Sequence, residues 1–425
     1  MDSEGCGCVR VKRATAIVGA CLLLVVQAFG LIPDSAAEQQ KKTMRHPTEE
    51  DAIRMVRIAG SGSINSYAGM LTEDFAYFSP DEKQFVIVLK KGNLEHNTNE
   101  YSLLLYQTNE AFASPMPVVL ARLSSSSNRE AITDVAWLSD NDTILFRGEN
   151  PGESSQLYSV STKTGALRKL TNHPTNLIEF ASDALGHTIV YAAEKPKPKV
   201  LTDQAAHEGV IVANEDMSEL LMGVRTDEIR DLFVLDTKTG KSRPLPIAPE
   251  LHGAFAGNYL HFSLSPDGRH LAARLNLLEV SPSWRDYRQP LLARILDRTL
   301  PKNALTWMFR YAVIDTVSGK GRVLLDGPVS YYGSEVVWGT DSKSVVLTGV
   351  LLPLDVATRN PKRLANPAVV TVELESLAFE VLSDDDLKFV RRERNGQRLV
   401  FEIRDRKSTR LNSSHVSQSR MPSSA

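Results

Sequence analysis

One strand–turn–strand pattern recurs five times along this chain of 425 residues and constrains its fold more than any other feature. In the clearest copy, two hydrophobic strand segments flank a Ser-Pro-Asp-Gly turn centred on Asp267. The turns of the other copies are centred on Asp81, Asp140, Asp183 and Asp341. An aspartate side chain can accept hydrogen bonds from backbone amides two residues further on, so these residues are expected to shape turns rather than do chemistry. A spaced, self-similar hairpin is typical of a repeat architecture.

A second hairpin follows most copies of the first. It has the form Asp-Thr-x-x-Gly, or Ser-Thr-x-x-Gly in one copy, and it places Gly165, Gly240 and Gly319 where a positive φ is expected. A weaker copy without glycine spans residues 369–382. Two hairpins in series form a four-stranded antiparallel unit, which is the blade of a β-propeller.

We therefore expect an all-β fold, a β-propeller with about five and a half blades and a short N-terminal helix. The helix is expected at about 48–57, with Thr48 as its N-cap. Within an incomplete propeller over 70–404, the five blades are expected at 70–125, 132–171, 175–246, 257–327 and 332–382, followed by the opening hairpin of another at 384–404 with Asn395-Gly396 at its turn.

The largest insertion between blade strands covers residues 276–308 and includes Trp284 and Tyr287. Such an insertion can line one face of a propeller and contact a ligand or a second domain. The alternative is a surface excursion that packs only its own few apolar residues. The sequence leaves both interpretations open.

The N-terminus has the pattern of a signal peptide over residues 1–37. Residues 9–13 are basic, residues 14–32 are almost wholly apolar, and small residues precede Glu38, the expected mature start. A polar segment, 38–69, would then lead into the propeller. The alternative is an uncleaved anchor, which would be the chain's single contact with a membrane. We expect an exported protein, periplasmic or extracellular, whose mature chain lacks cysteine because Cys6, Cys8 and Cys21 all lie in the leader.

Composition and motifs exclude several function classes. A net charge of −2 gives no basic surface for nucleic acid. The chain contains no Gly-x-Ser-x-Gly nucleophile elbow, no P-loop, no dinucleotide fingerprint and no His-Glu-x-x-His, and its histidines have no ligand spacing. His252 and His261 flank a strand and are interpreted as surface or packing residues. No catalytic, cofactor-binding or metal-binding residue and no cofactor is predicted.

The last 21 residues, 405–425, differ from the rest of the chain. Seven of these 21 residues are serine, and the segment has neither strand nor helix periodicity, so it is expected to be disordered. Residues 405–415 and 419–425 resemble the in-frame translation of a widely used sequencing-library adapter, with an index-sized gap between them. We therefore interpret this tail as derived from an adapter and expect that the natural protein continues differently after Arg404.

The paired hairpins resemble the N-terminal propeller of prolyl oligopeptidase-family serine peptidases of the dipeptidyl-peptidase IV type, especially the bacterial dipeptidyl-peptidase and acylaminoacyl-peptidase branch. Asp51-Ala-Ile-Arg-Met55 and Asn366-Pro-Ala-Val-Val370 strengthen the resemblance, which covers about 48–404. It implies a C-terminal α/β-hydrolase domain holding a catalytic serine, aspartate and histidine. None of those positions exists here, so no catalytic residue can be carried over. TolB-like propellers carry the same Pro-Asp-Gly turns.

Two functions follow from this resemblance. In the first, the chain is the non-catalytic propeller of an exported serine peptidase and gates the access of peptide substrates to a missing hydrolase domain, so the chain as given is not an enzyme. In the second, it is a stand-alone periplasmic, TolB-like propeller that binds a protein or cell-envelope partner. The insertion at 276–308 and the interrupted blade after 382 favour the first function.

Overall fold

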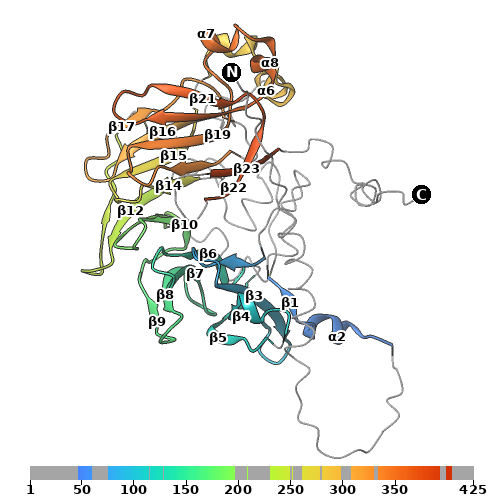
Figure 1. Ribbon diagram of the computed structural model, residues 1–425. Coiled ribbons are helices and arrows are strands. Elements are labelled where there is room, and N and C mark those ends of the chain that lie inside the picture. The colour runs from blue at the N-terminus through green and yellow to red at the C-terminus, as the bar shows by residue number, and fades with distance from the viewer. Residues whose placement is uncertain are drawn as a thin grey trace, which may run out of the picture. The chain divides into compact units, whose positions relative to one another are not determined.

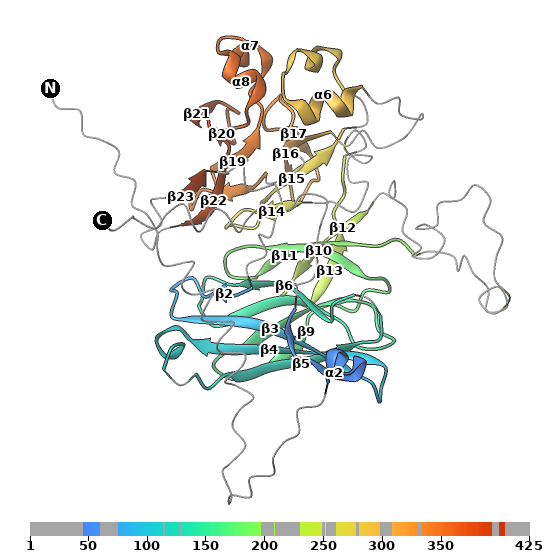
Figure 2. The same ribbon diagram turned by 90° about the vertical axis from the view of Figure 1, so that its right-hand side faces the viewer.

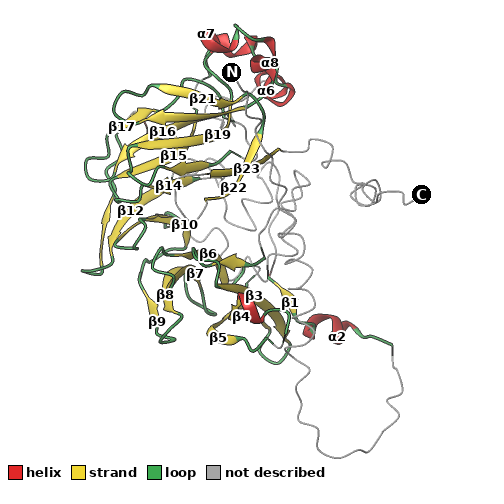
Figure 3. Ribbon diagram, viewed as in Figure 1, coloured by secondary structure: helices red, strands yellow, loops and turns green. Residues whose placement is uncertain are grey.

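The computed structural model describes residues 46–59, 75–113, 115–127, 129–196, 208, 230–248, 251, 261–277, 280–297, 308–329, 334–392 and 399–403. Figure 1 follows the chain through these segments, and Figure 3 shows that strands are far more frequent in them than helices. The predicted leader, the adapter-like tail and the Asn395-Gly396 turn lie outside the described residues. Two compact units are present, and each is described by itself.

The described residues of the first unit form one short helix and two blades. The helix is α2 (Glu49–Arg54), and a single 3-10 turn, η1 (Thr108–Glu110), follows β4. Blade 1 consists of β1 (Arg57–Ile58), β2 (Tyr77–Phe78), β3 (Gln84–Asn93), β4 (Thr98–Gln107) and β5 (Val118–Ser125). Blade 2 consists of β6 (Ile132–Trp137), β7 (Thr143–Gly148), β8 (Gln156–Ser161) and β9 (Leu167–Lys169).

The second unit contains three four-stranded blades and a final hairpin. Blade 3 consists of β10 (Leu177–Ser182), β11 (Thr188–Ala193), β12 (Asp231–Asp236) and β13 (Lys241–Pro244). Blade 4 consists of β14 (Phe262–Leu264), β15 (His270–Asn276), β16 (Phe309–Asp315) and β17 (Gly321–Val323). Blade 5 consists of β18 (Val336–Trp338), β19 (Ser344–Val350), β20 (Ala368–Glu373) and β21 (Phe379–Ser383), and β22 (Leu387–Arg392) pairs with β23 (Leu399–Ile403).

These sheets confirm the predicted all-β blade architecture, with every strand antiparallel to its neighbours. One local expectation was wrong. The helix begins as predicted, with a Thr48–Asp51 capping box, but it ends at Arg54 instead of continuing to residue 57. Arg57 and Ile58 instead pair with β3, because the backbone hydrogen bonds of the sheet outweigh the weak helical preference of Val56 and Ile58.

The turn aspartates are structural, as predicted. At the first turn of blade 3, Asp183 Oδ1 accepts hydrogen bonds from the backbone nitrogens of Leu185 and His187 at 3.0 Å each. In blade 4, Asp267 Oδ1 accepts one from the backbone nitrogen of Arg269 at 3.0 Å. The carboxylates therefore replace backbone acceptors where the chain reverses direction.

Positive φ values occur at the predicted glycines of the second turns, Gly165 (69°), Gly240 (67°) and Gly319 (71°). Each of these glycines donates its backbone N–H to the carbonyl four residues earlier, at 2.8–2.9 Å. In the glycine-free copy, Leu377 takes the same position with φ 57° and makes the same bond at 2.9 Å. The turn geometry is thus shared even where the sequence departs from the motif.

Neighbouring blades within each unit are joined by a repeated pair of contacts. A tryptophan at the end of a blade's first strand donates to a carbonyl of the preceding blade: Trp137 Nε1 to Tyr77 O at 2.9 Å, and Trp338 Nε1 to Ser263 O at 3.2 Å. The backbone nitrogen of the preceding turn aspartate, Asp267, also donates to Ser342 Oγ at 3.1 Å. Because the same polar links recur, the sequence repeat fixes the spacing between blades as well as the blades themselves.

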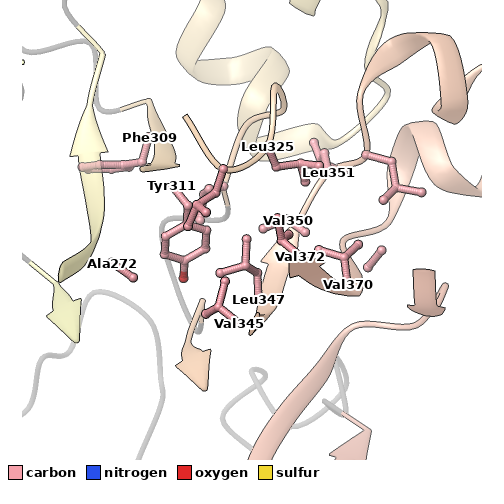
Figure 4. Packing of buried hydrophobic residues seen from close by; sticks show 14 of the residues in the cluster. Ala272, Phe309, Tyr311, Leu325, Val345, Leu347, Val350, Leu351, Val370 and Val372 are labelled. Atoms are coloured by element: carbon pink, nitrogen blue, oxygen red, sulfur yellow. The ribbon is translucent and has the colours of Figure 1, made fainter. Parts of the chain in front are cut away.

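Apolar side chains fill the spaces between neighbouring blades. Alternate residues of β15 face opposite sides of their sheet: Leu271, Ala273 and Leu275 belong to the cluster shared with blade 3, whereas Ala272 belongs to the cluster shared with blade 5. Figure 4 shows the latter cluster, in which Tyr311 lies among valines and leucines of blade 5. This packing buries both faces of the central strands and holds the blades of each unit together.

Candidate functional site

The insertions between the second and third strands of blades 4 and 5, in the second unit, both contain helices. The insertion of blade 4 forms η3 (Pro282–Asp286) and α6 (Pro290–Leu296). The insertion of blade 5 forms α7 (Leu354–Ala357) and α8 (Pro361–Ala365). In an antiparallel blade these two connections leave the same end of adjacent sheets, and the helices lie together in both views (Figures 1 and 2).

We call residues 280–297 and 353–366 the helical cap. Trp284 and Tyr287 of the blade 4 insertion are buried in the core shared with blade 5. The Tyr287 hydroxyl donates to Leu352 O at 2.7 Å, and the backbone nitrogen of Arg288 donates to Leu364 O at 2.7 Å. The insertion is therefore fastened to the next blade and does more than pack its own apolar residues. Its contact with a ligand or a second domain stays a prediction.

Sequence reasoning missed α7 and α8. Each is four or five residues long, which is too short for a hydrophobic periodicity to be visible. One signal was nevertheless available, because Asn360 followed by Pro361 is a typical helix start. Asn360 does act as the N-cap, with its Oδ1 accepting a hydrogen bond from the Lys362 backbone nitrogen at 3.0 Å.

A buried arginine lies at the same end of blade 4 as the helical cap. Arg274, on β15, is 3% exposed, and its guanidinium carbon lies 4.7 Å from the ring centroid of Phe309. Its Nη1 atom donates to Ser334 Oγ, just before blade 5, at 3.2 Å. Buried charge needs such partners, because desolvation is costly. Ser334 cannot be activated as a nucleophile by this contact, because a guanidinium stays protonated and is no base.

A carboxylate and a histidine lie beside this arginine. Glu179, on β10, accepts a hydrogen bond from the backbone nitrogen of Phe262 at 3.3 Å, and its Oε1 lies 3.9 Å from His261 Nδ1. The backbone nitrogen of Arg274 donates to His261 O at 2.8 Å. Glu179, His261, Arg274 and Ser334 thus bring together the beginnings of the first strands of blades 3, 4 and 5, and we call these four residues the polar network.

Burial and the positive charge of Arg274 lower the pKa of His261 to about 4. The His261 side chain is 63% exposed, and the nearby positive charge of Arg274 disfavours its protonated form. His261 is accordingly neutral at pH 7 and can accept or donate one hydrogen bond. The exposed His261 ring and the partly exposed Glu179 carboxylate are the groups of the network that a polar ligand can reach.

The sequence predicted no functional residue. The structure places His261, whose side chain is exposed, in the polar network. His252 lies outside the described residues. The signal that could have identified the network is Arg274 itself, a charged residue within the apolar strand Leu271-Ala-Ala-Arg-Leu275. No cluster of three or more His, Cys, Asp or Glu side chains suited to a metal ion occurs in the described part of the chain. No helix in that part is long and apolar enough to cross a membrane.

Comparison with known proteins gives one curated relative. No protein-family model matches the chain. The chain is 24% identical to YuxL of Bacillus subtilis, an uncharacterized peptidase, over an alignment of 215 residues that covers 49% of the chain. The match spans 30% of the length of YuxL.

Solved structures with similar folds include two kinds of protein. An acylaminoacyl peptidase in complex with Z-Gly-Gly-Phe-chloromethyl ketone has a TM-score of 0.42 and 14% identity, with 75% of this chain and 41% of that chain covered. TolB from Acinetobacter baumannii has a TM-score of 0.37 and 12% identity, with 79% and 61% covered. The chain thus spans less than two thirds of each of these proteins. As predicted, a peptidase, an acylaminoacyl peptidase and TolB are among the proteins that this chain resembles.

Proposed function

We propose that this chain is the propeller region of an exported serine peptidase of the prolyl oligopeptidase type. In this role it admits peptide substrates to an α/β-hydrolase domain encoded outside the present sequence. The observation that carries the proposal is the similarity to the peptidase YuxL. The match spans only 30% of YuxL, so most of that protein lies outside the matched segment. The absence of a Gly-x-Ser-x-Gly motif from the sequence agrees with a non-catalytic region.

Genomic DNA tests this proposal most directly. We expect the reading frame that follows codon 404 to encode a hydrolase domain with a Gly-x-Ser-x-Gly motif. The present chain should then neither hydrolyse peptide p-nitroanilides nor react with a serine-directed fluorophosphonate probe. Specific labelling of the purified chain would contradict the non-catalytic assignment.

The polar network is our candidate for peptide contact within the propeller. Its cation and carboxylate suit the charged and amide groups of a short peptide. A fluorescein-labelled Gly-Gly-Phe peptide and fluorescence anisotropy provide the assay. We expect Glu179→Gln to weaken binding about tenfold, which corresponds to roughly 1.4 kcal/mol. Glu375→Gln, in an exposed turn of blade 5, is the matched control and should bind as the unmodified chain does; equal binding by all three proteins would remove the network from the peptide path.

A TolB-like propeller that binds a protein or cell-envelope partner is the second candidate function. The Pro-Asp-Gly turn at residues 266–268 is compatible with this function, because such turns occur in both classes. The two functions predict different genes. A stop codon shortly after the last blade closes, without a hydrolase domain, would favour the TolB-like function and exclude the peptidase.

Export is part of both functions. We infer that residues 1–37 direct the chain across a membrane and are removed before Glu38. Cell fractionation followed by N-terminal sequencing tests this inference. A chain that stays membrane-bound with its leader attached would support the anchor alternative.

A further inference from the structure

The outer strand of blade 1 differs from the outer strands of the other blades. β5 is eight residues long, whereas β9, β13, β17 and β21 have three to five residues. Each of these shorter strands carries at least one charged residue: Arg168 and Lys169 on β9, Lys241 and Arg243 on β13, Arg322 on β17, and Glu380 on β21. Short length and charge are the usual protections of a strand edge against pairing with another chain. β5 also carries one charged residue, Arg122, but it begins with four uncharged residues, 118–121.

Exposed apolar side chains gather at the beginning of this strand. Phe112 is 69% exposed, Met116 is 72% exposed, Val118 is 56% exposed and Val119 is 42% exposed. All four lie within eight consecutive positions of the chain. We call them the β5 patch. No other described strand pairs with the free edge of β5, since the sheet ends there.

We propose that the β5 patch and the free edge of β5 form a dimer interface with a second copy of this chain. Two β5 strands would pair antiparallel about a two-fold axis near Val119, so that Val119 lies opposite its own copy. Two identical strands that pair antiparallel are related by such a two-fold axis, so both copies use the same surface. The uncharged residues 118–121 allow this strand pairing, because no like charges meet across the two-fold axis.

The area of the patch agrees with a weak, specific dimer. The four exposed side chains present roughly 400 Å² of apolar surface, comparable to the largest patch on a typical monomer. Two copies would bury roughly 800 Å², and the paired strand backbones would bring the total towards the ~1,000 Å² that a specific interface needs. A bulge at Leu120 limits the length of strand that can pair, which restricts the contact to the beginning of β5.

Charge substitutions at Val119 test the proposal in solution. Sedimentation velocity of the full chain should show a reversible monomer–dimer equilibrium with a dissociation constant on the order of 1–100 μM. Val119→Lys and Val119→Glu should each weaken the dimer at least tenfold, because like charges would lie directly opposite one another. An equimolar mixture of the two variants should form the dimer again, which an unfolded variant could not do.

The matched control is Leu167→Lys, on the outer strand of blade 2, where Leu167 is 40% exposed. This variant should keep the dimer. Hydrogen exchange gives a second measurement, because the β5 amides should become protected as the concentration rises while the β9 amides do not change. The proposal fails if the unmodified chain is monomeric at 100 μM, if it forms open-ended polymers that the Val119 variants do not affect, or if the mixed charges do not restore the dimer.

Discussion

Gly240 and Gly319 occupy the same position in the same turn motif, yet alanine should affect them very differently. Their φ values are 67° and 71°, so at either position alanine must adopt the left-handed conformation, which costs about 1 kcal/mol. At Gly240 an added Cβ would meet no atom within 4 Å. At Gly319 it would lie 1.3 Å from the carbonyl oxygen of Pro246 and 2.4 Å from its carbonyl carbon.

Neither of those Pro246 atoms can move away without displacing the chain between blades 3 and 4. The Ala248 backbone nitrogen donates to Gly319 O at 3.2 Å, so the linker is held against the turn. Forcing a methyl group into a packed site typically costs a further 1–3 kcal/mol or so. Gly319→Ala should therefore lower the free energy of unfolding by about 2–4 kcal/mol, against about 1 kcal/mol for Gly240→Ala.

Urea denaturation followed by tryptophan fluorescence measures this difference. Both glycines lie in the second unit, so one unfolding transition can report on both variants, and an unchanged m-value would show that the two transitions are comparable. Equal losses of stability would show that the linker does not pack on the Gly319 turn. A larger loss for Gly240→Ala would refute the reasoning altogether.

Other predictions concern buried hydroxyls and pH. Tyr287→Phe should lower the free energy of unfolding by about 1–3 kcal/mol, because Leu352 O loses its hydrogen-bond donor. Tyr101→Phe should leave the stability unchanged or raise it, because the Tyr101 hydroxyl has no hydrogen-bond partner among the described residues. Thermal unfolding compares the two variants. The hydrogen bond from the Ser318 backbone N–H holds the pKa of Asp315 below its ordinary value of 3.8. The ionised carboxylate therefore stabilises the folded state above pH 3.8, and this contribution is lost as the pH falls through the lower pKa of the folded state. Asp315→Asn should therefore lose less stability than the unmodified chain between pH 7 and pH 2, and equal losses in urea titrations would contradict this.

The repeated elements were predictable because their causes are local. The Asp267 and Gly319 turns depend on the conformations that those residues favour, and the strands between them follow a period of two. The helix N-cap at Thr48 could likewise be predicted, because it needs only Asp51 three residues later. The end of that helix could not be predicted, because pairing with β3, more than 30 positions away, decides the conformation of Arg57.

The candidate site could not be predicted for the same reason. Glu179 and Arg274 are separated by almost a hundred positions. Glu179 looks like an ordinary polar residue of a strand, and although Arg274 stands out as a charge in an apolar strand, its partners are defined only once the blades stand side by side. The helical cap also depends on distant partners, since Tyr287 is fastened to Leu352. Short insertion helices gain their stability from such packing and not from their own propensity.

Taken alone, the sequence determines the kind of blade and the positions of its hairpins, because each hairpin encodes its own turn and its own alternation of buried and exposed side chains. The tertiary structure decides what each copy of the repeat does. It brings Pro246 against Gly319 and leaves open space beside Gly240, and it buries Arg274 against Phe309 and beside His261. Local conformational preference acts within a few residues, whereas close approach, burial and charge pairing arise only when distant segments meet.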